Sequence, residues 1–303
     1  MVKRIKEEIG RMWKMEEGGD MSHFLGIKIS RDREAKTMDL KQTSYIKQLL
    51  KKHLDKHRRN SSIVGKLLWL SNGTCPDISQ AVGVLARYMT QPSRDHYNVA
   101  QKVLQYLDCT QDVHLRYGGD KQQDFLTVHS DVNWASDAMA QCRSLSGSAV
   151  FMHRNLVAWK SALQHCTALS AVEAEFVAAT EATQEVLFFG QLFKAIGIDV
   201  GIPIIFSDNT GTIQVSRDPA QHWKLKHIDT KYHFIRDDMQ DGKVKIKYIG
   251  TADNLADVFT KPVNKEVLRC AQQGLGLTSQ QSTVVQQTSA SPLRETVEGD
   301  VTT

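Results

Sequence analysis

The apolar positions of the first 118 residues predict two strands followed by several helices. Residues alternate over Phe24–Ile29 and Thr37–Leu40, which is typical of strands, and Ser44–Leu50 begins an amphipathic helix. From Ile63 to Leu107 the apolar spacing is helical in two or three segments separated by prolines. This region contains no grouping of acids or nucleophiles, so it predicts binding or packing rather than catalysis.

After Gly118-Gly119 the apolar period changes from helical to alternating, and we place a domain boundary there. The pattern predicts, in order, strands Phe125–Ser130, Ser146–Met152 and Leu156–Trp159, helix Ala171–Phe193, strand Ile202–Phe206, helices Thr210–Val215 and Asp229–Met239, strand Val244–Ile249 and a helix from Asn254. This is an α/β order. The chain is Ser/Thr/Gln-rich after Gly276, so the predicted regions are 1–118, 119–275 and a disordered tail over 276–303.

Composition is that of an ordinary globular protein, with 41% apolar and 24% charged residues among 303. No apolar run reaches the length of a membrane span and the first residues do not resemble a signal peptide, so we expect an intracellular protein, cytoplasmic or nuclear, with no membrane contact. The five cysteines are scattered without a C-x-x-C pair. They predict buried, unpaired thiols rather than a disulfide framework or a zinc site.

The two halves of the chain differ in charge, and this difference is more informative than the overall net charge of +4. Residues 1–118 carry 21 Lys and Arg against 13 Asp and Glu, whereas residues 119–303 carry 17 against 21. A basic first half would suit a polyanion and an acidic second half a metal ion. Solvated charged faces alone explain such a split equally well.

Four acids of the second region, Asp131, Glu175, Asp208 and Asp257, are candidates for a shared site. Asp131 and Asp208 each come directly after a predicted apolar strand, so neighbouring strands would bring the two carboxylates together at one sheet edge. An unpaired buried acid is unfavourable, and a bound cation removes that penalty.

The helix predicted from Ala171 carries two glutamates with different expected roles, one structural and one a candidate metal ligand. Ser170 and Glu173 form a capping-box pattern, in which Ser170 caps the helix and Glu173 reaches back. Glu175 falls on the margin of the apolar stripe that runs from Val172 to Leu187. It either faces a metal shared with Asp131 and Asp208 or reaches solvent at the edge of the stripe.

Seven short motifs then occur in order over about 130 residues. Together they resemble the ribonuclease H domain of copia-type LTR retrotransposon Pol polyproteins; the motifs are His129–Ala135, Arg143–Gly147, Trp159–Ser161, Ala168–Phe176, Ser207–Asn209, Lys226–Asp229 with Tyr232–Arg236, and Leu255–Pro262. The resemblance implies an α/β ribonuclease H-like fold, a mixed five-stranded sheet with helices.

The resemblance extends upstream to the end of a reverse transcriptase. Phe24–Ile27 and Ser44–Leu50 resemble the end of the palm with its primer-grip strand, and Val64–Leu70 with Pro76–Ile78 resembles the thumb and connection. This implies a mostly helical fragment before the ribonuclease H-like domain. Compared with the family, residues 56–62 look like a shortened linker. The Tyr-x-Asp-Asp motif of the polymerase is absent, and the Asp237-Asp238 pair falls in a predicted helix, so a polymerase is not expected.

The resemblance also implies the chemistry. Asp131, Glu175, Asp208 and Asp257 match residues that bind two Mg²⁺ ions, for which Mn²⁺ is a possible substitute, and the expected reaction is hydrolysis of the RNA strand of an RNA/DNA hybrid. Candidate nucleic-acid contacts are Ser130 and Asn209 beside the acids, and the basic group Lys224, Lys226, His227 and Lys231, for which a solvated helix face remains an alternative. Two other interpretations stay open: a catalytically inactive nucleic-acid-binding remnant, and an unfolded remnant without activity.

Overall fold

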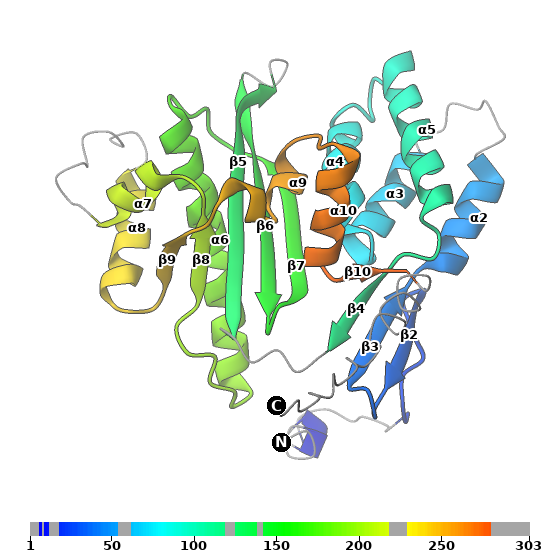
Figure 1. Cartoon of the computed structure of the whole chain (residues 1–303), viewed down its shortest axis with the longest axis horizontal. Coiled ribbons are helices and arrows are strands. Elements are labelled where there is room, and N and C mark those ends of the chain that lie inside the picture. The colour runs from blue at the N-terminus through cyan, green and yellow to red at the C-terminus, as the bar shows by residue number, and fades with distance from the viewer. Residues whose placement is uncertain are drawn as a thin grey trace, which may run out of the picture.

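The computed structural model describes residues 6–7, 9–11, 18–53, 62–118, 125–137, 142–217 and 229–279. Two five-stranded sheets make up its frame; the first combines four strands of the first half with one strand from the end of the described chain, and the second lies within the second half (Figure 1). Within the described residues, no helix is both long enough and apolar enough to cross a membrane. All five cysteines are unpaired, as predicted, but the prediction that they are buried is correct only for Cys75.

The first sheet is antiparallel, in the order β1-β2-β3-β4-β10. Its strands are β1 (His23–Phe24), β2 (Ile27–Asp32), β3 (Thr37–Lys41), β4 (His114–Gly118) and β10 (Leu277–Thr278). The prediction of a strand at Thr37–Leu40 is confirmed. The single strand predicted over Phe24–Ile29 is wrong, because a turn at Leu25 and Gly26, both with positive φ, divides it into β1 and the start of β2, which pair antiparallel. The description of this half as mostly helical is incomplete, because β4 and β10 were not expected and they complete a sheet.

The helices of the first half pack around a core of their own. They are α2 (Thr43–His53), α3 (Ser62–Gly73), the 3₁₀ turn η1 (Pro76–Ile78), α4 (Ser79–Arg87) and α5 (Arg94–Cys109). Their buried aliphatic side chains, among them Ile46, Leu67, Val82 and Leu104, form one cluster. The predicted helical segments between Ile63 and Leu107 are confirmed, with a proline at the first position of η1.

The second sheet is mixed, in the order β7-β6-β5-β8-β9, as expected for a five-stranded mixed sheet with helices. Its strands are β5 (Leu126–Asp137), β6 (Arg143–Met152), β7 (Asn155–Leu163), β8 (Ile204–Ser207) and β9 (Lys245–Tyr248). Strands β5, β6 and β7 are antiparallel neighbours, whereas β8 and β9 run parallel to β5. The long β5 therefore joins the two parts of the sheet.

Strand β5 is longer than predicted, so Asp131 lies inside the strand and not directly after it. Asp131 pairs with Gly147 and Val132 pairs with Ser146, because backbone pairing with β6 continues past the acid. A carboxylate in the ladder does not interrupt the main-chain hydrogen bonds. The prediction for Asp208 is confirmed, since it follows Ser207 at the end of β8.

Helix α6 (Ala171–Ala195) supplies the main packing surface of the second sheet. Its buried Phe176, Ala179, Ala182 and Val186 pack with Val128 of β5 and with other sheet residues. Helices α7 (Thr210–Arg217) and α8 (Asp229–Gln240) complete this layer, and Asp237-Asp238 lies in α8 as predicted. The helix predicted from Asn254 is divided into α9 (Asp257–Thr260) and α10 (Lys265–Gly274), and the 3₁₀ turn η4 (Thr251–Asp253) precedes it. Pro262, which cannot continue a helix, lies between α9 and α10.

The end of the described chain returns to the first half. Strand β10 pairs with β4, and Leu115 of β4 shares an apolar cluster with Phe151 of β6 and Leu275 beyond α10. The tail boundary predicted at Gly276 is therefore too early, because strand pairing continues to Thr278. Residues 280–303 and the shortened linker around 56–61 lie outside the described residues.

A candidate metal centre

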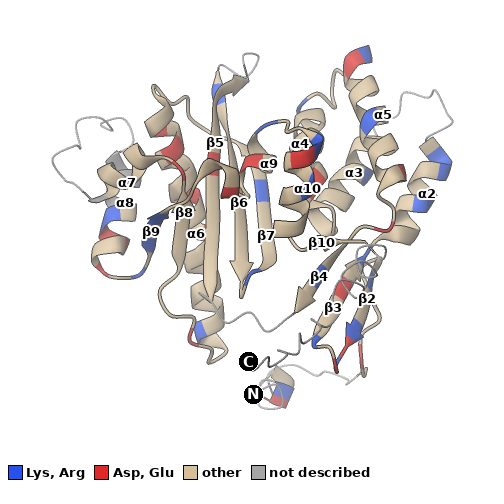
Figure 2. Cartoon of the chain, in the orientation of Figure 1, with Lys and Arg blue, Asp and Glu red and all other residues tan. Residues whose placement is uncertain are grey.

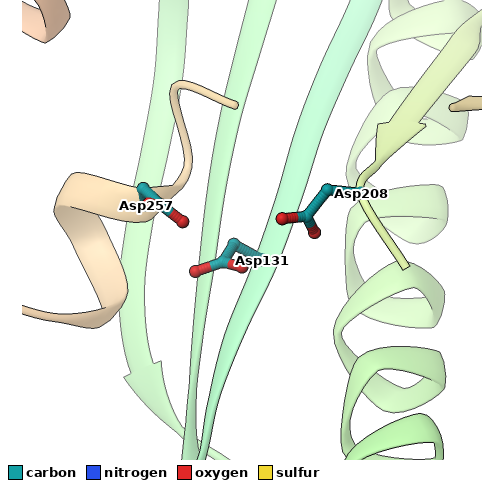
Figure 3. A group of neighbouring side chains, drawn as sticks. All are labelled: Asp131, Asp208 and Asp257. Carbon is teal, nitrogen blue, oxygen red and sulfur yellow. The ribbon is translucent and has the colours of Figure 1, made fainter. Parts of the chain in front are cut away.

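Two adjacent parallel strands bring Asp131 and Asp208 to the same level of the sheet. His129 of β5 is opposite Phe206 of β8, so continuing the register two residues further places Asp131 beside Asp208. Asp257 is the first residue of α9, which packs against β5 and β6. One ligand oxygen of each aspartate lies within 4.8 Å of the others, and the carboxylates point toward one another (Figure 3).

Each aspartate is held by one specific neighbour. The hydroxyl of Thr260 donates to Asp131 Oδ2, Thr251 Oγ1 donates to Asp208 Oδ2 at 2.8 Å, and Lys261 Nζ lies 2.9 Å from Asp257 Oδ2. These contacts orient the carboxylates without neutralising all of their charge. Figure 2 shows acidic positions on β5 and on α9, the helix that packs on this part of the second sheet.

The donor set fits a hard divalent cation. Asp257 Oδ1 is buried and has no hydrogen-bond partner among the described residues, although its other oxygen is paired. Three carboxylates in such a small space repel one another unless a cation or a proton is shared between them. Oxygen ligands of this kind are those that Mg²⁺ and Ca²⁺ take in proteins.

Glu175 of α6 stands beside the three-aspartate group. Its side chain is only 8% exposed, and Oε2 is buried without a hydrogen-bond partner among the described residues. Burial, together with the charges of Asp131, Asp208 and Asp257, raises the pKa of Glu175 to about 9. The alternative that Glu175 reaches solvent is therefore wrong.

The same crowding acts on Asp131 itself. Burial raises the pKa of Asp131 to about 7, against the hydrogen bond from Thr260, and the charge of Asp257 adds to the increase. Binding of a cation to these carboxylates would therefore compete with protons for them.

The nearby Glu173 has a structural role, as predicted, with one difference in its partner. Ser170 Oγ accepts from the backbone N–H of Glu173 and caps α6. Glu173 Oε2 reaches back to the N–H of Leu169 at 2.8 Å rather than to that of Ser170. It fixes the segment that leads into α6, and so fixes the start of the helix that carries Glu175.

The candidate nucleic-acid contacts are only partly tested by the structure. Ser130 is 1% exposed, so its side chain is not accessible for the predicted contact with nucleic acid. Asn209 Oδ1 accepts from the N–H of Thr212 and so caps α7, which leaves only its amide nitrogen for the predicted contact. The basic candidates Lys224, Lys226 and His227, and the side chain of Lys231, lie outside the described residues.

Several residues of the site were missed by the sequence reasoning. Lys261 lies four residues after Asp257, a helical spacing that does predict an ion pair. The bond between Thr260 and Asp131 joins residues 129 positions apart and has no local signal.

Comparisons with known proteins identify relatives among retrotransposon polyproteins. The chain is 28% identical over 310 aligned residues to the Retrovirus-related Pol polyprotein from transposon TNT 1-94 of Nicotiana tabacum, which covers 92% of this chain and 23% of the relative. It is 32% identical to the corresponding polyprotein from transposon RE1 of Arabidopsis thaliana, over 71% of this chain and 15% of that one. No protein-family model matches the chain.

Among solved structures, the N-terminal RNase H domain of rv2228c from Mycobacterium tuberculosis aligns with 49% of this chain and 96% of its own, at 14% identity and a TM-score of 0.31. The chain spans less than a quarter of the length of the two polyproteins. The relatives cover most of the chain, and the second sheet has the mixed five-stranded order expected from the sequence motifs. The chain belongs to the copia-type retrotransposon Pol polyproteins, and its second half is a ribonuclease H-like domain.

Proposed function

We propose that this chain hydrolyses the RNA strand of RNA/DNA hybrids, using two divalent metal ions held by Asp131, Glu175, Asp208 and Asp257. The observation that carries the proposal is the meeting of three aspartates from separate segments within 4.8 Å, beside a buried glutamate with an unpartnered oxygen among the described residues. A structural ion pair or a folding core would not gather four acids in this way.

Mg²⁺ suits these ligands because it takes few carboxylates and keeps sites for water and phosphate oxygens, and Mn²⁺ is a possible substitute. When bound, the metal ions supply a water of lowered pKa as nucleophile and stabilise the leaving oxygen of the phosphodiester. Residues beside the acids orient their carboxylates and offset part of their negative charge. Thr260 and Thr251 each fix one oxygen of an aspartate, and Lys261 offsets part of the negative charge.

Binding of the nucleic acid would use both halves. Helix α2 presents Lys47, Lys51 and Lys52 to solvent, within a first half that carries a net charge of +8. Such a surface attracts phosphates without reading bases. We also keep Asn209, Lys224, Lys226, His227 and Lys231 as proposed contacts with the nucleic acid.

The test is cleavage of a labelled RNA/DNA hybrid by the purified full chain with Mg²⁺, with Mn²⁺, and with EDTA. A DNA duplex of the same sequence is the control substrate. We expect cleavage of the RNA strand with either metal ion, none with EDTA, and an intact DNA duplex. Binding of the hybrid without cleavage in any metal ion would instead support an inactive nucleic-acid-binding remnant.

A further inference from the structure

Ser161 lies on β7, the edge strand of the second sheet, in a motif that the proposed chemistry does not use. Strand pairing places Ser161 opposite Gly147 of β6, and Gly147 opposite Asp131 of β5. Residues directly opposite one another in neighbouring strands have their side chains on the same face of the sheet. Ser161 therefore lies on the face that carries Asp131, and α9 packs across this face against β5, β6 and β7.

The hydroxyl of Ser161 holds α9, the short helix that begins with Asp257. Ser161 Oγ donates to the carbonyl oxygen of Phe259 at 2.6 Å. The last carbonyl groups of a helix have no partner within it, and α9 has only four residues, so it depends on contacts of this kind. Phe259 is fully buried, and the hydroxyl of Thr260 next to it contacts Asp131. A shift of α9 at Phe259 would therefore move Asp257 and Thr260 together.

The same strand is attached to the first half of the chain. Trp159 Nε1 donates to the carbonyl oxygen of Ser71, close to the end of α3, at 2.8 Å. Trp159 lies two residues before Ser161, so both side chains are on the same face of β7. Two side chains of one strand thus pair with carbonyl groups near the ends of two helices, one from each half of the chain.

Helix α4 of the first half completes the surroundings of Ser161. It packs against both β7 and α9. A Cβ at Gly83 of α4 would lie 3.7 Å from the carbonyl oxygen of Ser161 and 3.8 Å from its Oγ. A methyl group fits at this distance, whereas a larger side chain would press on Ser161. The first half therefore limits the position of the strand that holds α9.

We propose that Ser161 is a positioning residue for the metal centre, and that the first half, through α4 and the contact of Trp159, sets how closely Asp257 approaches Asp131. The inference rests on the proposed function for the identity of the bound ion. Ser161 acts through the backbone of α9, because its hydroxyl is used in the bond to Phe259. The first half thus has a role in the metal centre besides the proposed binding of phosphates.

The first test is binding of Mn²⁺ to the full chain without nucleic acid, measured from the electron paramagnetic resonance of the free ion. The variants are Ser161→Ala, which removes the hydroxyl, and Ser161→Thr, which keeps it. The matched control is Ser216→Ala in α7, because Ser216 Oγ also donates to a main-chain carbonyl, that of Ile213 at 2.8 Å.

We expect Ser161→Ala to weaken Mn²⁺ binding about tenfold, as is typical of residues that orient metal ligands, and Ser161→Thr and Ser216→Ala to stay within about twofold of the parent. Ser161→Ala and Ser216→Ala should lower the melting temperature by similar amounts, since each loses one hydrogen bond. A purely structural role of Ser161 would not separate the two in metal binding. Unchanged affinity in Ser161→Ala, or an equal loss in Ser216→Ala, would overturn the proposal.

The second test changes only the first half. Gly83→Leu should displace β7 at Ser161 and weaken Mn²⁺ binding about fivefold, whereas Gly83→Ala should bind like the parent, because its methyl group fits. Hydrogen exchange in EDTA gives a measure that needs no metal. The N–H of Lys261, bonded to the carbonyl oxygen of Asp257 at 3.2 Å, should exchange faster in Gly83→Leu and Ser161→Ala than in their controls. Equal affinity and exchange in the two Gly83 variants would overturn the role of the first half.

Cleavage assays separate this inference from the proposed function. Excess Mg²⁺ should restore much of the hybrid cleavage by Ser161→Ala, but not that by the ligand variant Asp208→Asn. If the parent chain binds Mn²⁺ and does not cleave hybrid, the proposed hydrolysis fails and the positioning role stands. If the parent cleaves hybrid and Ser161→Ala has the same kcat and Mg²⁺ requirement, the positioning role alone fails. A parent chain that binds no Mn²⁺ would overturn both.

Discussion

Asp131 and Gly147 are directly opposite each other on β5 and β6, and Gly147 is the point where α9 rests on the sheet. A Cβ at position 147 would lie 2.7 Å from Thr260 Cγ2, 2.8 Å from the carbonyl oxygen of Ala256 and 3.0 Å from Phe259 Cβ. The helix that supplies Asp257 can approach Asp131 only because this side chain is absent.

Gly147→Ala is therefore expected to push α9 away from the sheet and to separate Asp257 from Asp131. We expect it to reduce hybrid cleavage more than tenfold and to cost about 1–3 kcal/mol of stability from overpacking. Gly190→Ala in α6 is the matched control, because a Cβ there meets only Val200 Cγ2 at 3.9 Å. Cleavage assays and urea unfolding of both variants check this, and equal behaviour of the two would contradict it.

Asp208→Asn should abolish hybrid cleavage and leave the fold intact, because it removes the ligand charge and keeps the size of the side chain. The new amide can still accept the hydrogen bond from Thr251 through its oxygen. In EDTA its melting temperature should rise slightly, since one of the repelling acids is gone. Cleavage by the purified variant at a tenth or more of the parent rate would show that the site is wrongly assigned.

Glu173→Ala should reduce stability, whereas Glu175→Ala should abolish cleavage. The first removes the acceptor of the Leu169 N–H and should cost about 0.5–2 kcal/mol of stability, with cleavage retained. The second should abolish cleavage with little loss of stability, because Glu175 Oε2 has no hydrogen-bond partner among the described residues. Thermal unfolding and cleavage rates of both variants provide the comparison. The opposite pattern would mean that the structural and catalytic glutamates have been exchanged.

The raised pKa of Glu175, about 9 against an ordinary 4.5, gives the metal-free protein a specific pH dependence. Because the folded-state pKa lies above the unfolded value, its contribution to stability is full below pH 4.5 and is lost as the pH rises toward 9. Asp131, with a pKa of about 7, adds to the loss of stability below about pH 7. His129 has the opposite effect in that range, because burial lowers its pKa to about 4 and the folded protein becomes more stable as the pH rises above this value.

Burial also raises the pKa of Asp77, so the comparison with Glu175→Gln, rather than the pH range alone, isolates Glu175 between about pH 7 and about pH 9. In EDTA, the urea midpoint of the parent chain should fall across this range, and that of Glu175→Gln should fall less steeply. Saturating Mg²⁺ should reduce the slope of the parent, because the cation replaces the proton. Parallel curves for the parent and the variant in EDTA would show that Glu175 is not the titrating group.

The exposed lysines of α2 should bind phosphates of the duplex. Replacing Lys47, Lys51 and Lys52 with Gln should weaken binding of hybrid and of DNA to similar extents, and should reduce the salt slope by about one for each phosphate that is no longer bound. The control is Lys194→Gln, an exposed change near the far end of α6. A salt titration with an unchanged slope would remove α2 from the binding surface. The full chain is used because β10 and α10 pack against the first half.

The sequence predicted the fold of the second half well because its elements have strong local signals. The alternating strands, the cap at Ser170 and the apolar stripe of α6 are all readable over a few residues. The four acids were also identifiable, since Asp208 directly follows an apolar strand and Glu175 borders the stripe of α6.

What could not be predicted depends on contacts between distant segments. The long β5 continues past Asp131 only because β6 pairs with it, and β10 exists only because β4 offers an edge. The 1% exposure of Ser130 likewise depends on the elements packed around β5 and not on the local pattern of the strand. No pattern within a short window contains this information.

The pairing of β4 with β10 has a consequence for synthesis on the ribosome. Strand β4 is complete when residue 118 has been made, but its partner at Leu277–Thr278 is translated about 160 residues later. Until then the emerging first half carries an unpaired strand edge and the uncovered apolar side of Leu115, both of which favour association with other chains. The nascent protein therefore cannot finish its first folded unit before nearly all of the second has emerged, and early termination before Leu277 would leave that edge open permanently.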